Sequence, residues 1–178
     1  MCIRDRQVLG NWAILDPDQW AERLEQWVPA GCDALIVERE RLDPYEYIEI
    51  WLTDAGLAGT EEFVPRYREW LGYFARLGIT EVGMGWLNVR HVGADTPTVR
   101  VESWPHAVQQ PVGPAIGEWF DAAALLRGLD DAELLDRCWC TAEGLRQETL
   151  AEPGASDPNH IVFRQYRGLL RAIEADTA

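Results

Sequence analysis

An almost continuous apolar run, CDALIV, occupies residues 32–37. Pro29-Ala30-Gly31 precedes this run with residues that favour a turn, and the charged stretch Glu38-Arg39-Glu40 follows it. A short apolar run between such boundaries is typical of a strand that is buried on both faces. We therefore predict a central strand at residues 32–37.

The segment before this strand has the pattern of a strand followed by a helix. Residues 7–11 are a short apolar run closed by Gly10, which we interpret as a strand. Asp16-Pro17-Asp18 then provides an N-cap residue, a proline at the first helical position and an acidic first turn. Apolar residues repeat at helical spacing up to about Val28. Strand, helix and strand in this order predict an α/β fold.

Two more helices and two more strands are expected before residue 104. Asp43-Pro44 repeats the capping pattern for a helix that ends near Gly56. Another helix is expected from Thr60 to Leu77, where Gly78 stops it. Residues 79–92 and 98–102 have strand-like patterns, and the turn formers between them favour a hairpin.

The composition of the sequence changes at residues 104–114, where prolines and glycines are concentrated. Such a segment is typical of a domain boundary. We expect one domain at residues 7–104 and a small α+β appendage at residues 112–178. In the appendage we expect helices at residues 114–126 and 131–136, followed by strands at residues 138–150 and 161–170 that turn helical at the end. Residues 1–6 are expected not to be native.

Composition excludes several classes of function. The chain has 178 residues and a formal net charge of −14, which disfavours nonspecific binding to nucleic acid. No apolar run approaches the roughly 18 residues that a membrane-spanning helix needs, and no secretory signal is present. We therefore expect a cytoplasmic protein without a membrane partner.

Common catalytic and nucleotide-binding motifs are absent. The sequence has no glycine-rich dinucleotide or phosphate loop, no His-Glu-x-x-His and no Gly-x-Ser-x-Gly. The three histidines are far apart in sequence, so we expect no metal site. We interpret Cys138 and Cys140, on either side of Trp139, as buried free thiols on one face of a strand.

Four residues are candidates for a substrate site. Asn11 and Trp12 come at the end of the first predicted strand, and Glu38 and Arg39 come at the end of the second. In an open parallel sheet, ligands collect at the carboxyl ends of the strands. Trp12 and Trp104 both lie at the ends of predicted elements, and two interpretations are open for each ring. The ring lines a pocket or stacks on a planar group in the first interpretation, and it packs in the core in the second.

Several segments, in this order and spacing, resemble the later part of the class I S-adenosylmethionine-dependent methyltransferases. The similarity is to the small-domain and N5-glutamine methyltransferase group, in particular to actinobacterial-type members with an additional C-terminal region. It covers nearly the whole chain from Gln7. The segments that carry it are Val8 to Trp12, Cys32 to Glu40, Asp43 to Tyr47, Val82 to Trp86, Val101 to His106, Gln110 to Pro114, Gln147 to Thr149 and Asp157 to Gln165.

The resemblance implies that the chain is the carboxyl half of a Rossmann-like methyltransferase sheet. Residues 7–11, 32–37 and 79–91 would be its fifth, sixth and seventh strands, and the seventh would run antiparallel between the other two. The family's glycine-rich cofactor turn and Asn-Pro-Pro-aromatic motif do not occur here, and both would lie upstream of residue 1. We therefore expect an N-terminally truncated chain whose partner is the missing N-terminal half of the same polypeptide.

The resemblance also implies a function, which is methyl transfer from S-adenosylmethionine to a nitrogen acceptor on a protein or RNA. Asn11 would be a hydrogen-bond partner of the acceptor, Trp12 an apolar or stacking surface, and Glu38 or Arg39 a further part of the same edge. The chain has no catalytic or cofactor-binding residue of the family, so we expect it to be inactive alone and to bind the cofactor weakly.

Two alternatives come from other classes of protein. The acidic composition and the nine tryptophans are compatible with a noncatalytic module that binds another protein. An enzyme with a site around His106, Gln109 and Gln110 is a third possibility, but no motif supports it.

Overall fold

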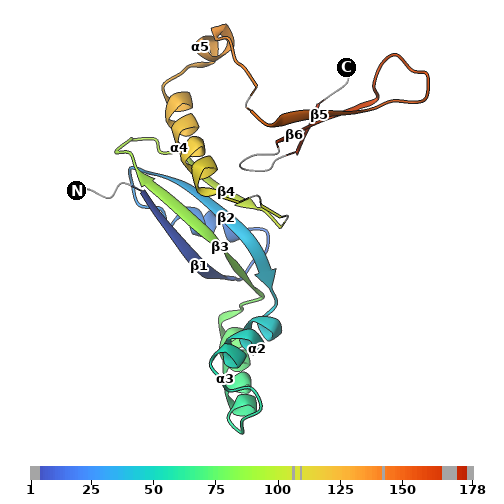
Figure 1. The fold of residues 1–178 in the computed structure, drawn as a ribbon. Helices are drawn as coiled ribbons and strands as arrows, with labels where there is room; N and C mark the ends of the chain where they lie inside the picture. The colour runs from blue at the N-terminus through green and yellow to red at the C-terminus, as the bar shows by residue number, and fades with distance from the viewer. Residues whose placement is uncertain (1–4, 106, 109, 142, 166–171, 176–178) are drawn as a thin grey trace. The chain divides into compact units, whose positions relative to one another are not determined.

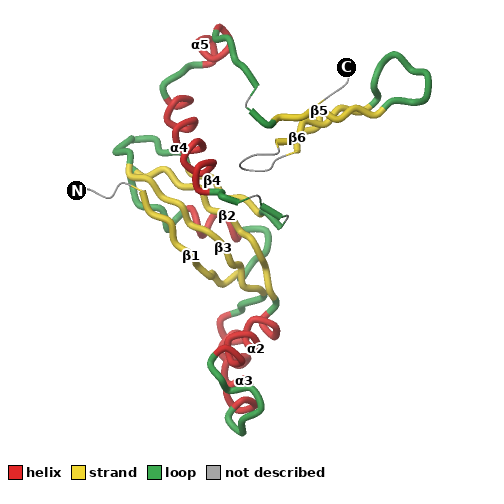
Figure 2. Tube along the Cα trace, viewed as in Figure 1, coloured by secondary structure: helices red, strands yellow, loops and turns green. Residues whose placement is uncertain are grey.

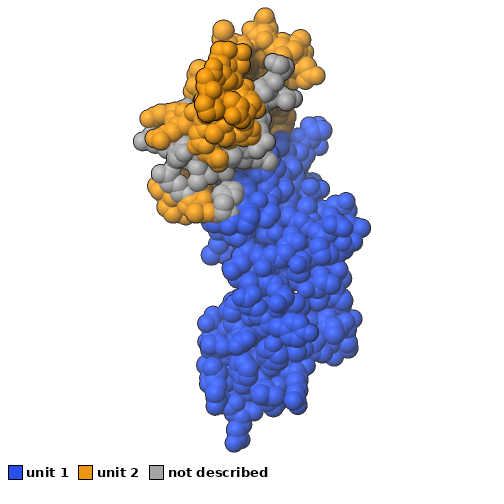
Figure 3. All heavy atoms as spheres, turned by 90° about the vertical axis from the view of Figure 1, so that its right-hand side faces the viewer, with its two compact units in different colours: residues 1–106 blue, residues 107–178 orange. Residues whose placement is uncertain are grey.

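The computed structural model describes residues 5–105, 107–108, 110–141, 143–165 and 172–175. The chain divides into two compact units, residues 1–106 and residues 107–178 (Figure 3). The division falls within the proline-rich and glycine-rich segment at residues 104–114. Both units combine helices with strands (Figure 2), so the chain is a mixed α/β protein.

The sheet of the first unit has the strand order β1-β3-β2-β4 (Figure 1). Its three long strands are β1 (Asp5–Ile14), β2 (Cys32–Leu42) and β3 (Glu81–His91). β3 is antiparallel to both of its neighbours. Consequently β1 and β2 run in the same direction and end at the same edge of the sheet. This is the order that the family resemblance implied for these three strands.

The fourth strand, β4 (Val99–Ser103), pairs parallel with β2, so the predicted hairpin between β3 and β4 is wrong. β3 is already hydrogen-bonded to β1 on one side and β2 on the other, which leaves no edge for β4. The connection instead crosses the start of β2. There the backbone N–H groups of Val92 and Gly93 each donate to the carbonyl of Gly31 at 2.9 Å.

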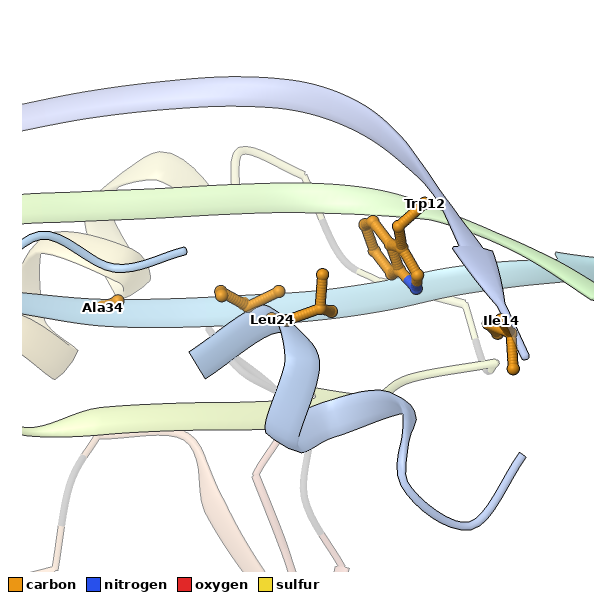
Figure 4. Packing of buried hydrophobic residues seen from close by; sticks show 5 residues of the cluster. Trp12, Ile14, Leu24 and Ala34 are labelled. Carbon is orange, nitrogen blue, oxygen red and sulfur yellow. The ribbon is translucent and has the colours of Figure 1, made fainter. Parts of the chain in front are cut away.

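A short helix, α1 (Trp20–Glu25), covers one face of this sheet, which we call the α1 face. The core beneath it is built from buried apolar side chains, labelled in part in Figure 4: Trp12, Ile14, Leu24, Ala34 and Ile36. α1 begins later and ends earlier than predicted. Asp16 caps a turn instead of the helix, because its Oδ1 accepts from the N–H of Asp18 at 3.0 Å and its carbonyl accepts from the N–H of Gln19 at 3.2 Å.

Two helices lie between β2 and β3 in the sequence and form a hairpin beyond the end of these strands (Figure 1). In α2 (Pro44–Asp54), the Asp43 side chain accepts from the N–H of Glu46 at 2.8 Å, which confirms the predicted N-cap. α3 (Phe63–Leu77) begins three residues after the predicted Thr60 and ends, as predicted, at Gly78, whose φ of 68° is left-handed.

In its described residues, the second unit contains two helices and a small antiparallel sheet. The helices α4 (Gly113–Arg127) and α5 (Asp131–Asp136) agree closely with the prediction, and Asp130 and Glu133 form a capping box at α5. The strands are β5 (Leu145–Leu150), β6 (His160–Gln165) and β7 (Ala172–Ala175), in the order β5-β6-β7. Residues 166–171, where we predicted a helical ending, lie outside the described residues.

The prediction for Cys138 and Cys140 is wrong, because both thiols are exposed and neither residue belongs to a strand. α5 has already ended at Asp136, and the next strand begins only at Leu145. At the other end of the chain, β1 includes Asp5 and Arg6. No helix in the described parts of the chain is long and apolar enough to cross a membrane.

Candidate functional site

The four candidate residues lie on β1 and β2, close to the edge at which both strands end. β3 runs between them, with Gly83 opposite Trp12 and Gly85 opposite Glu38. Both strands continue past the candidates, β1 to Ile14 and β2 to Leu42. The expectation that these residues end the two strands is therefore wrong.

A β-bulge interrupts the pairing of β2 at its charged residues. The register shifts between Glu38 and Glu40, so that Arg39 is an extra residue without a partner on β3. A bulge of this kind bends the strand and changes the face of the sheet to which the following side chains point. As a result, Glu38 is opposite Gly85, whereas Glu40 is opposite Met84, the next residue back along β3.

The sheet separates the four candidates into two pairs. Neighbouring residues of a strand point to opposite faces, so Asn11 and Trp12 lie on opposite sides of β1. Register places Trp12 and Glu38 on the α1 face. Asn11 and Arg39 belong to the other face, because Arg39 packs on Trp86, which is two residues from the Asn11 partner Met84.

Trp12 is a core side chain with only 3% of its surface exposed. Its ring stacks on Trp20, with the ring centres 6.3 Å apart and the planes at 7°. Its Nε1 is buried and has no hydrogen-bond partner among the described residues. Trp104 is also buried, and its Nε1 donates to Glu102 Oε2 at 2.7 Å. For both rings the structure favours the core interpretation over an open stacking surface.

Glu38 is a buried carboxylate, 2% exposed, that holds an arginine. Arg41 Nη2 lies 2.9 Å from Glu38 Oε1, and Arg41 Nη1 lies 3.2 Å from Glu81 Oε2. The Arg41 guanidinium also packs on Trp20, with its Cζ 5.3 Å from the ring centre. A buried carboxylate needs such a counter-ion, because an unpaired charge in the interior is costly. The structure thus gives Glu38 a structural partner.

Arg39 ties the bulge of β2 to the segment after β4. Its Nη1 donates to the carbonyl of Trp104, and its Cζ lies 5.2 Å from the ring centre of Trp86. In the same place the backbone N–H of Trp104 donates to the carbonyl of Glu38 at 2.8 Å. The Arg39 side chain is half-buried, and these contacts hold its guanidinium in place.

Asn11 is the exposed member of the set. Its Nδ2 donates to the hydroxyl of Tyr47 on α2 at 3.3 Å. Asn11 is therefore a surface residue at the junction between the sheet and the α2–α3 hairpin. Of the four candidates, Asn11 has the side chain that a ligand reaches most directly.

A pocket of about 420 Å³ lies beside the carboxyl end of β1. Apolar groups and three polar side chains line it, and one of these, Arg23, donates from Nη1 to the carbonyl of Ala13 at 3.0 Å. None of the four candidates is in its lining. The lining residues are Ala13, Ile14, Leu15, Asp16, Gln19, Trp20, Arg23, Leu77 and Ile79.

Sequence reasoning missed Tyr47 and Arg41, which bind two of the four candidates. Arg41 is three residues after Glu38, and in a regular strand this spacing would put the two side chains on opposite faces. Only the bulge brings them together, and the sequence contains no clear signal for it. Tyr47 lies on a helical face, where its contact with a strand 36 residues earlier has no local signature.

Among the described residues, no group of three or more His, Cys, Asp or Glu side chains is arranged to hold a metal ion. His106 and Gln109, from the third hypothesis, lie outside the described residues. The chain matches no protein-family model, and comparisons with curated proteins and with solved structures also give no match. Its function therefore has to be inferred from the fold and the side chains themselves.

Proposed function

We propose that this chain is the carboxyl part of a class I S-adenosylmethionine-dependent methyltransferase that methylates a nitrogen atom on a protein or RNA. The observation that carries the proposal is the strand order β1-β3-β2, in which the last of three strands lies antiparallel between two earlier ones. The sheets of the methyltransferases that the sequence resembles end in this order, whereas here β4 adds one more strand beyond β2. The Rossmann-like character of the sheet and the role of the second unit as an appendage are part of the proposal.

The outer edge of β1 supports the proposal. Among the described residues, no strand pairs with this edge. Val8 and Leu9, which point to opposite faces, are 55% and 77% exposed. Apolar residues on both faces are typical of an interior strand of an α/β sheet. The proposed partner, an N-terminal half of the same polypeptide, would supply the next strand and helices over both faces.

Methyl transfer requires the donor sulfur, the methyl carbon and the acceptor nitrogen to be held in line. S-adenosylmethionine would supply the methyl group. The described residues do not fit this cofactor by themselves, because the buried carboxylate of Glu38 is bonded to Arg41 and the indole of Trp12 is packed in the core. The contribution of this chain is then one wall of the acceptor site, where the exposed amide of Asn11 hydrogen-bonds the acceptor.

Calorimetry with S-adenosylmethionine tests the proposal. The 178-residue chain should show no saturable binding in the micromolar range. The same chain joined to the residues encoded upstream should bind the cofactor and methylate a nitrogen acceptor. In that longer protein, Asn11→Ala should lower kcat/KM for the acceptor and leave cofactor affinity unchanged. Micromolar binding by the 178 residues alone would contradict the claim that they are only a part.

A noncatalytic acidic module that binds another protein is the second candidate. The net charge of −14 favours it, together with the exposure of Trp51 (40%) and Tyr73 (51%). The two candidates differ at β1. An unpaired edge strand promotes association, and an inserted lysine blocks it. If size-exclusion chromatography shows that Leu9→Lys lowers the state of association, the methyltransferase part is favoured, whereas an elution that Leu9→Lys leaves unchanged favours the module.

A further inference from the structure

The α2–α3 hairpin carries one continuous aromatic surface, which we call the aromatic face. Tyr47 connects the two helices, with its ring centre 6.0 Å from those of both Trp51 and Phe74. Phe74 in turn lies 6.4 Å from Trp70 and 6.3 Å from Tyr73. Because each ring contacts the next, these five side chains form a single surface across both helices.

This surface is incompletely covered. Trp51 is 40% exposed and Tyr73 is 51% exposed. Ile50 and Leu77, which also belong to these two helices, are 42% and 46% exposed. No residue of the 15-residue helix α3 is fully buried. Helices in proteins draw most of their stability from packing an apolar side against the rest of the protein. An apolar side that nothing covers therefore indicates a binding surface.

The charges on the two helices indicate what covers this surface. α2 has three acidic residues and no basic one, whereas α3 has three arginines and one glutamate. A second copy of the hairpin, turned about a twofold axis along the hairpin, would place each α2 against an α3. A twofold interface uses the same patch on both subunits, and here that patch pairs acidic with basic helices.

We propose that the aromatic face binds the same face of a second copy of this chain and forms a four-helix interface. Asp54 ends α2 and Arg66 lies in the first turn of α3, so both are at the tip of the hairpin. The twofold arrangement brings Asp54 of one copy to Arg66 of the other. Within one chain Arg66 pairs with Glu69 at 3.1 Å, but both side chains are exposed, and such a pair exchanges easily.

Sedimentation equilibrium of the 178-residue chain that carries Leu9→Lys, which blocks association through β1, tests this interface. We expect a reversible monomer–dimer equilibrium. Trp51→Ala should weaken the dimer about tenfold or more, because a large aromatic side chain at the centre of an interface carries much of its affinity. The matched control is Trp139→Ala, which removes a tryptophan that is 56% exposed in the other unit and should leave the dissociation constant unchanged.

Exchange of the charges at Asp54 and Arg66 tests directly whether the partner is a second copy of the chain. Asp54→Arg alone and Arg66→Asp alone should each weaken the dimer about fivefold, and the double variant should recover affinity to within about twofold. Leu9→Lys separates this interface from association through β1 and should not affect it. A monomer from about 1 μM to about 1 mM would overturn the proposal. So would a dimer that Trp51→Ala leaves intact, or one that Leu9→Lys abolishes.

Discussion

Gly83 lies directly opposite Trp12, and a Cβ atom at Gly83 would be only 2.1 Å from Nε1 of Trp12. The same atom would be 2.8 Å from Oε2 of Glu38. The absence of a side chain at this position therefore lets the indole and the carboxylate share the space above β3. One glycine thus permits both the stacking of Trp12 on Trp20 and the burial of Glu38.

Gly83→Ala should destabilise the first unit. The new methyl group has no space, and overpacking of a filled core costs about 1–3 kcal/mol, so we expect a loss of about 2–3 kcal/mol in the free energy of unfolding. Urea denaturation followed by tryptophan fluorescence measures it. Gly72→Ala in α3 is the control, because its nearest neighbour is a flexible Arg76 end at 3.7 Å. This control should be neutral or stabilising by up to about 1 kcal/mol.

Arg41→Met should cost more than removal of an exposed arginine. It leaves the Glu38 carboxylate, 2% exposed, without its cation, and we expect a loss of about 2–4 kcal/mol in unfolding free energy. The double variant Glu38→Gln with Arg41→Met should be more stable than Arg41→Met alone. Arg164→Met breaks a pair in which both side chains are 47% exposed, and it should cost less than about 1 kcal/mol. Equal losses for the two arginines would show that Glu38 is not held as described.

Asp43→Ala should remove the N-cap of α2. The Asp43 side chain accepts from the N–H of Glu46 at 2.8 Å, and loss of such a cap typically costs about 1 kcal/mol. Asp43→Asn keeps an accepting oxygen and should retain most of the stability. Thermal unfolding followed by circular dichroism compares the two variants. If both lose the same amount, the charge of Asp43 matters and the hydrogen bond does not.

Tyr67 should make stability fall at alkaline pH. Partial burial, and then the carboxylates of Glu49 and Asp43, raise the pKa of Tyr67 above its ordinary value of 10.0. The folded chain therefore holds the phenolic proton more tightly than the unfolded chain does. The resulting stability is complete below pH 10 and is lost as the pH rises through the folded pKa.

Tyr67→Phe should therefore make this alkaline loss of stability shallower. Urea unfolding at about pH 9 and about pH 11 measures the difference for both proteins. Val64→Ala, which changes an exposed side chain of the same helix and removes no titratable group, is the control and should leave the slope as it is in the parent chain. An identical slope for Tyr67→Phe and the parent would contradict the raised pKa.

Local signals predicted the helices with clear caps, and longer-range choices were harder to predict. Asp43-Pro44 identifies the start of α2 because capping is a contact within a few residues, whereas the similar Asp16-Pro17 caps only a turn ahead of α1. The place of β3 between β1 and β2 was predicted from the family resemblance. The partner of β4 was not, because it depends on which strand edge remains free once the sheet has formed.

The candidate site was predicted less well than the fold. Sequence position placed Asn11, Trp12, Glu38 and Arg39 near one edge of the sheet, and they lie there. Their division between two faces, and the burial of Trp12 and Glu38, depend on the bulge in β2 and on the space above Gly83. Neither feature has a local signature, since both arise from strands that are distant in sequence.

The most direct test of the proposed function is to sequence the source DNA upstream of the codon for Met1. Our account predicts an open reading frame that continues in frame and encodes a glycine-rich turn followed by an Asn-Pro-Pro-aromatic motif. A stop codon and a ribosome-binding site immediately ahead of Met1 would contradict it and would favour the acidic interaction module.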